Sequence, residues 1–116
     1  MAKEKTLSWW QRLRGEVVWH VASTVATSAE IPAILPEKGA VIIGTDAKPQ
    51  WLVFDCPCGK GHRITVTLNP ANQRHWKVLQ NKMLSVYPSI EDKTEGRHCH
   101  FLITNGNIMW ISADKR

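Results

Sequence analysis

The chain has 116 residues, of which 43% are hydrophobic, enough for one core and typical of a single domain. It has no apolar run of about 18 residues, the length expected of a membrane-spanning helix. Its N-terminus lacks the apolar stretch of a signal peptide. We therefore expect a cytoplasmic protein that does not enter a membrane.

The net charge of +5 is unevenly distributed. Residues 56–90 contain no Asp or Glu and hold the whole basic excess, namely Lys60, Arg63, Arg74, Lys77 and Lys82. Such a surface can attract nucleic-acid phosphates or an acidic protein. However, five charges over this length do not form the dense stripe of a dedicated DNA-binding protein, and scattered solvated charges are at least as good an explanation.

We expect two parts: a Trp-rich N-terminal extension, residues 1–27, packed on a β-rich domain, residues 28–116. In the extension, Ser8 can cap a short helix that places Trp9 and Trp10 on one face. Packing of these tryptophans on the core is favoured over docking to a partner.

Short apolar runs that alternate with turn residues predict a mainly β fold, with a small α+β fold as the alternative. The runs 40–43 and 51–54 and the alternating segment 63–68 predict strands, so 51–68 should form a hairpin. Residues 71–81 favour a helical turn or loop, and 83–87 favour a strand that Pro88 ends. Around Asn105-Gly106, a typical tight turn, the sequence predicts a final antiparallel hairpin.

Three cysteines lie in the two most histidine-rich places on the chain, Cys56-Pro-Cys58-Gly-Lys-Gly-His62 and His98-Cys99-His100. An odd number of cysteines, two of them one residue apart, argues against a disulfide scaffold. Thiolates and imidazoles together are the ligands of structural zinc. The pattern therefore predicts one structural Zn²⁺ that staples the domain.

The fourth ligand is open to two interpretations. On a regular strand His98 and His100 face one side and Cys99 the other. One ligand set is Cys56, Cys58, Cys99 and one histidine, which requires a bend at 98–100; the other is Cys56, Cys58, His98 and His100. The first is favoured. His62 is a possible substitute ligand or hydrogen-bond donor to a sulfur, but a solvated loop histidine is its favoured interpretation.

The sequence shows no obvious catalytic constellation. Ser89 is the one serine considered as a nucleophile, and a turn hydroxyl bonded to its neighbours is the favoured interpretation. A zinc hydrolase using His62 or Glu95 as base is the weakest hypothesis, because a thiolate-rich site is a poor Lewis acid. The residues favour a binding protein over an enzyme.

An ordered set of motifs resembles a family of small bacterial proteins known as a domain of unknown function. The motifs are Phe54-Asp-Cys-Pro-Cys-Gly59, Leu68-Asn-Pro70, Trp76, Leu84-Ser-Val-Tyr-Pro-Ser-Ile90, His100-Phe101 and Asn105-Gly-Asn-Ile-Met-Trp110. The resemblance covers about residues 28–112. Some members are encoded beside ubiquitin-like conjugation genes, so it implies an accessory or ligase-like role in such a pathway.

Two departures from the family pattern bear on the metal site. Lys60 stands where the family has a third cysteine, and Arg97 where it has another, while this chain has Cys99. Moving a sulfur by two residues keeps its strand face. The resemblance thus supports Cys56, Cys58, Cys99 and His100 as ligands of a structural zinc.

The favoured function is a zinc-binding protein-recognition module whose partner is a component of a ubiquitin-like conjugation pathway. The alternative is a nucleic-acid-binding zinc protein that uses the basic 56–90 stretch, with Trp76 and Tyr87 as stacking surfaces.

Overall fold

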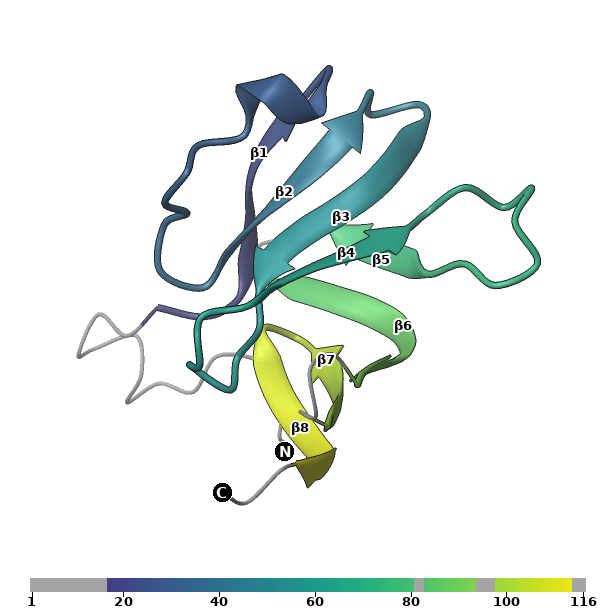
Figure 1. Ribbon diagram of the computed structural model, residues 1–116. Helices are drawn as coiled ribbons and strands as arrows, with labels where there is room; N and C mark the ends of the chain where they lie inside the picture. Colours follow the sequence, from purple (N-terminus) through teal and green to yellow (C-terminus); the bar gives the residue numbers. More distant parts are fainter. Residues whose placement is uncertain (1–16, 81–82, 94–97, 114–116) are drawn as a thin grey trace.

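The computed structural model describes residues 17–80, 83–93 and 98–113, which form two four-stranded β-sheets (Figure 1). Sheet A has the order β1 (His20–Val25), β2 (Gly39–Gly44), β3 (Pro49–Asp55) and β4 (Arg63–Thr67). Sheet B has the order β5 (Lys77–Gln80), β6 (Leu84–Asp92), β7 (Cys99–Thr104) and β8 (Asn107–Ala113). The predicted mainly β fold is confirmed.

One short 3-10 helix, η1 (Ser28–Glu30), lies in the connection between β1 and β2. The predicted N-terminal helix, with Trp9 and Trp10, lies outside the described residues. Of the predicted extension, the described part contributes β1, which pairs with β2 in parallel. All other strand pairs are antiparallel. None of the helices in the described ranges has the length and apolar character needed to span a bilayer.

Both sheets contribute to one hydrophobic core. Alternate residues of β4 and β7 are buried, as expected for strands with one face on the core. Phe54 of β3 meets Phe101 of β7 edge to face, with ring centroids 6.2 Å apart. Such pairs add about 0.5–1.5 kcal/mol beyond the burial of their area. The core therefore joins the ends of β3 and β7, where the cysteines lie.

Backbone hydrogen bonds also connect the two sheets. The Trp76 N–H donates to the Thr67 carbonyl at 2.9 Å, and the Leu84 N–H donates to the Trp19 carbonyl at 2.9 Å. The predicted Asn105-Gly106 turn joins β7 to β8. At Gly106, φ is +80°, and a Cβ there would lie 2.9 Å from Val18 Cβ, so glycine is required for both reasons.

β6 differs most from its prediction. It passes through Pro88 and continues to Asp92, and β5 lies where a helical turn or loop was expected. Val86 pairs with Ile103 but Ile90 pairs with Phe101, so β6 has two more residues than β7 between these pairs. This bulge contains Pro88, whose missing N–H a regular ladder would not tolerate. The irregularity sets the position of Ser89.

Candidate functional site

The turn between β3 and β4 forms a knuckle that begins at Cys56. A hydrogen bond of 2.9 Å from the Cys56 N–H to the His62 carbonyl closes this turn. The Lys60 N–H faces Cys58 Sγ at 3.4 Å, so a backbone amide points at the sulfur. Gly59 and Gly61 adopt φ of +77° and +83°, which other residues rarely do. The glycines thus allow the chain to bend around the sulfur atoms.

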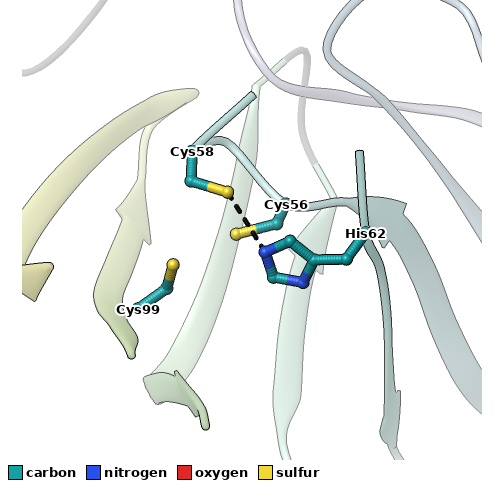
Figure 2. Close-up of side chains that lie close together, drawn as sticks. All are labelled: Cys56, Cys58, His62 and Cys99. Atoms are coloured by element: carbon teal, nitrogen blue, oxygen red, sulfur yellow. Dashed lines mark hydrogen bonds between the residues drawn. The ribbon is translucent and has the colours of Figure 1, made fainter. Parts of the chain in front are cut away.

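Four side chains converge at this knuckle (Figure 2). The Sγ atoms of Cys56, Cys58 and Cys99 and a ring nitrogen of His62 all lie within 4.8 Å of one another. Cys58 Sγ is 3.1 Å from His62 Nε2. Sulfur ligands of a zinc tetrahedron lie about 3.8 Å apart when each Zn–S bond is about 2.3 Å. The donor set and its spacing therefore fit one metal ion.

The other ring nitrogen of His62 faces a carboxylate. His62 Nδ1 lies 2.7 Å from Asp92 Oδ2, and Asp92 lies opposite Cys99 in the β6–β7 register. Histidine ligands commonly turn their second nitrogen toward a carboxylate, which fixes the ring and increases its basicity. Asp92 is thus placed to orient His62 toward the sulfurs.

Burial controls the protonation of two of the thiols. Desolvation is the largest cause that raises the pKa of Cys56 and of Cys99 above the usual value. Because thiolates are the metal-binding form, a cation within the cluster would have to compensate for this desolvation. The cysteines are not joined by disulfides.

His100 does not join the cluster. The structure brings together the three predicted sulfurs, but the imidazole beside them belongs to His62, which the sequence reasoning held as a substitute. The side chains of β7 alternate, so buried Cys99 faces the core and half-buried His100 faces the opposite side. Although a register shift follows His100, it does not bring its ring to the sulfurs.

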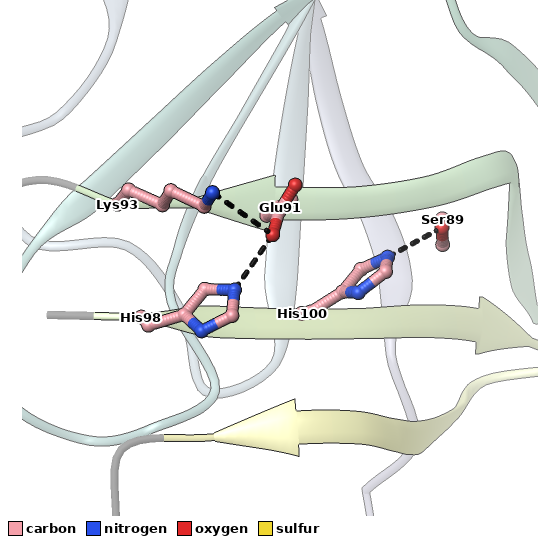
Figure 3. A network of polar contacts seen from close by, with 5 residues as sticks. All are labelled: Ser89, Glu91, Lys93, His98 and His100. Atoms are coloured by element: carbon pink, nitrogen blue, oxygen red, sulfur yellow. Dashed lines mark hydrogen bonds and ion pairs between the residues drawn. The ribbon is translucent and has the colours of Figure 1, made fainter.

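His100 instead pairs with Ser89. Ser89 Oγ and His100 Nε2 are joined by a hydrogen bond of 2.9 Å across β6 and β7 (Figure 3). Both side chains are half-buried. The Ser89 carbonyl accepts a hydrogen bond of 3.2 Å from the Trp76 indole. A hydroxyl held against an imidazole nitrogen is the arrangement that activates a serine nucleophile.

Two further residues extend this polar face. Glu91 lies opposite His100 in the register and accepts a hydrogen bond of 2.6 Å from His98 Nε2 (Figure 3). Lys93 Nζ lies 3.8 Å from the same carboxylate oxygen. The hydrogen bond from His98 is the largest cause that lowers the pKa of Glu91, so Glu91 is a carboxylate. The charge next to His100 is therefore negative.

From the sequence, a turn hydroxyl was the favoured interpretation of Ser89, and Trp76 was predicted only as a stacking surface. The sequence did carry one signal for the role of His100. Side chains alternate along a strand, so residues 98–100 place His100 on the face opposite Cys99. Its partner could not be found in the same way, because the bulge shifts the register of β6 by two residues.

In the basic stretch, Arg63 is held by side-chain contacts. Arg63 Nε donates to Asp55 Oδ1 at 3.0 Å, and its Nη2 donates to the Ala33 carbonyl at 3.1 Å. Lys82 lies outside the described ranges. Nucleic-acid binding stays a prediction.

Comparison with known proteins places the chain in a family. No curated protein and no solved structure matches it significantly. The model of one protein family matches residues 27–111, nearly three quarters of the chain. That family is described as the bacterial ubiquitination-like system serine protease, BubE, and the chain belongs to this family.

Proposed function

We propose that this protein is a serine peptidase of a bacterial ubiquitination-like system, with Ser89 as nucleophile and His100 as general base. The observation that carries the proposal is the 2.9 Å contact between Ser89 Oγ and His100 Nε2. The description of the family as a serine protease supports it independently. The bonds to be cleaved are peptide or isopeptide bonds made to a ubiquitin-like protein.

In the first half-reaction, neutral His100 accepts the Ser89 hydroxyl proton at Nε2 while Oγ bonds to the substrate carbonyl carbon. The resulting tetrahedral intermediate collapses when the His100 imidazolium donates this proton to the leaving amine. An ester to Ser89 and a free amine result. The Glu91 carboxylate, opposite His100 in the register, favours the imidazolium that forms between these two steps.

In the second half-reaction, water replaces the amine. His100 Nε2 accepts a proton from the water as its oxygen bonds to the ester carbonyl carbon. The proton then returns to Ser89 Oγ as the ester bond breaks, which releases the carboxylic acid and restores the free enzyme. The same imidazole therefore serves as base and acid in turn.

We propose that Cys56, Cys58, His62 and Cys99 hold one structural Zn²⁺. The support is the set of three sulfurs and one nitrogen, which fills a tetrahedron and leaves no position for water or substrate. Bound zinc would tie the β3–β4 knuckle of sheet A to the start of β7 in sheet B. Reduced thiols also support a cytoplasmic location, where such ligands persist.

A non-catalytic recognition role in the same pathway is the second candidate. It is favoured by exposed apolar side chains on β8, where Met109 and Ile111 are 57% and 53% exposed. Such side chains can dock a protein partner. This candidate requires association with a partner but no bond cleavage, so one assay separates it from the peptidase proposal.

The test uses the full zinc-loaded chain and the ubiquitin-like protein of the same system, extended at its C-terminus by a fused reporter. Cleavage should release the reporter, and Ser89→Ala and His100→Ala should each slow cleavage at least about 100-fold. Ser23→Ala, an exposed serine on β1, is the matched control and should not change the rate. Stable binding without cleavage would instead support the recognition role.

A further inference from the structure

We infer that the substrate is an extended, flexible polypeptide segment that pairs as an added strand with the free edge of β6 beside Ser89. This inference rests on the proposed function, because it places the segment against the proposed nucleophile. The observation behind it is that β5 pairs with β6 only as far as Tyr87, while β6 continues to Asp92.

The edge is open because the chain leaves sheet B just before β5. The Trp76 N–H bonds to the Thr67 carbonyl of β4, which directs the preceding segment toward sheet A. β5 is the outermost strand of its sheet. Within the described ranges, no strand pairs with β6 on this side from residue 88 onward.

The direction of the backbone groups fits an added strand. The Ser89 carbonyl points toward this edge, because Trp76 next to β5 donates to it at 3.2 Å. In an extended strand the N–H and C=O groups of alternate residues face the same edge, so those of Glu91 also face it. Ile90, between them, pairs with Phe101 of β7 on the other side. An edge without a partner strand is a template for an incoming peptide.

The position of the nucleophile explains why a strand should bind here. Paired strands lie about 4.8 Å apart, so a segment added to β6 would bring a carbonyl carbon within reach of Ser89 Oγ. A loop fixed inside a folded domain cannot expose its backbone in this way. A flexible tail can, and this selects unstructured chain termini over folded regions.

An apolar groove lies beside Trp76 and β5. It has a volume of about 300 Å³ and is lined by residues that include Leu68, Pro70, Trp76 and Val78. Trp76 thus joins the groove to Ser89, since its indole N–H bonds to the Ser89 carbonyl. An apolar side chain of the bound segment fits this groove, which adds side-chain selectivity to the backbone pairing.

The test begins with a mixed library of unstructured peptides of about twelve residues, incubated with the full zinc-loaded chain and read by mass spectrometry. One cleaved peptide is then resynthesised with a single N-methyl group at each backbone nitrogen in turn. Strand pairing predicts that kcat/KM falls at least about tenfold at alternate positions, mainly through KM, because N-methylation removes an N–H donor.

Two variants probe the same edge from the protein side. Glu91→Pro removes the N–H that faces the edge, and Glu91→Ala keeps it while removing the same carboxylate. We expect the KM of Glu91→Pro to exceed that of Glu91→Ala at least about tenfold. If Glu91→Pro does not fold, the N-methyl series still decides the question.

A small fluorophosphonate probe tests the Ser89 nucleophile separately from the addition of a substrate strand. Labelling of Ser89 together with an alternating N-methyl pattern supports both the nucleophile and strand addition. Labelling with no cleaved library peptide, or with no alternation, would overturn strand addition and leave the nucleophile standing. If neither labelling nor cleavage occurs in folded protein, the proposed function fails and this inference fails with it.

Discussion

Neighbouring residues at the start of β7 belong to two different side-chain clusters. Cys99 points to the core and its thiol joins the sulfur cluster, while His100 points to the polar face and its ring contacts Ser89. On β6, Asp92 likewise contacts His62 of the sulfur cluster, while its neighbour Glu91 lies opposite His100. Because the two faces are distinct, substitutions one residue apart should affect either the metal or the reaction.

The two histidines of the polar face should differ in importance. His100→Ala removes the proposed base and should lower kcat/KM at least about 100-fold. His98→Ala removes a hydrogen bond to Glu91 but no group that contacts Ser89, so its loss should be smaller than about tenfold. Steady-state kinetics with the fused reporter measures both, and equal losses would contradict the assigned roles.

A second comparison concerns the metal. His62→Ala should release zinc to a chelator much faster than His100→Ala, because the His62 ring lies among the sulfurs and the His100 ring does not. His75→Ala, on the loop before β5, serves as the control. A metal-sensitive dye follows the release. Faster release from His100→Ala would restore the ligand set that the sequence favoured.

The sequence predicted that the three cysteine sulfurs lie together, because all three cysteines stand beside histidines in two short segments. The imidazole that lies beside them belongs to His62, whereas the sequence favoured His100. Choosing His100 over His62 required a bend at 98–100 that would turn both Cys99 and His100 to one side, and β7 keeps its alternation there. The knuckle turn of Gly59 and Gly61 instead brings His62 back to the sulfurs, and its exact shape is not readable from residue types.

At the scale of the element, the bulge in β6 and the indole of Trp76 together position Ser89. Bulges re-aim a side chain next to a functional site, and here the bulge interrupts the pairing with β7 at the residues preceding Ile90. The Trp76 hydrogen bond then holds the carbonyl of Ser89. We therefore predict that Trp76 positions Ser89 and does not itself react.

Trp76→Phe tests this role, since it keeps an aromatic ring and removes the indole N–H. A neutral hydrogen bond contributes about 1 kcal/mol to stability, so the loss in the free energy of unfolding should be of that order. The fall in kcat should be about tenfold, with KM changed less, because Ser89 loses its orientation. A fall in stability with kcat unchanged would show that Trp76 serves packing alone.

Strands with a clear alternating pattern were predictable, and the β3–β4 and β7–β8 hairpins are found where the sequence places them. β5 was missed because four residues beside a polar loop carry little periodicity. The extension of β6 past Pro88 was missed because proline normally ends a paired strand. Here β5 begins at Lys77, opposite Tyr87, so Pro88 has no partner residue in β5 and no ladder hydrogen bond is lost on that side.

At the scale of the molecule, the cluster lies between two sheets that share a core and a few backbone hydrogen bonds, so a metal bound there would tie them. Cys56, Cys58 and His62 lie in the turn between β3 and β4 of sheet A, and Cys99 begins β7 of sheet B. A structural zinc contributes on the order of 10 kcal/mol in small zinc peptides, comparable with the whole stability of a domain. Metal binding should therefore be required for the fold.

Elemental analysis should find one zinc per chain in purified protein. Cys58→Ser should give unfolded or insoluble protein, whereas Ser23→Ala should retain the metal and the unfolding transition. Circular dichroism during heating follows the transition. A metal-free preparation that keeps its full cooperative transition would show that the cluster is not a structural zinc site.

The central claim is that Ser89 is a nucleophile activated by His100, and covalent labelling tests it most directly. The folded, zinc-loaded chain is treated with a fluorophosphonate, digested, and mapped by mass spectrometry. We predict an adduct on Ser89 that Ser89→Ala abolishes, that His100→Ala slows at least about 100-fold, and that Ser23→Ala leaves unchanged. An adduct on another serine, or none at all on folded protein, would contradict the claim.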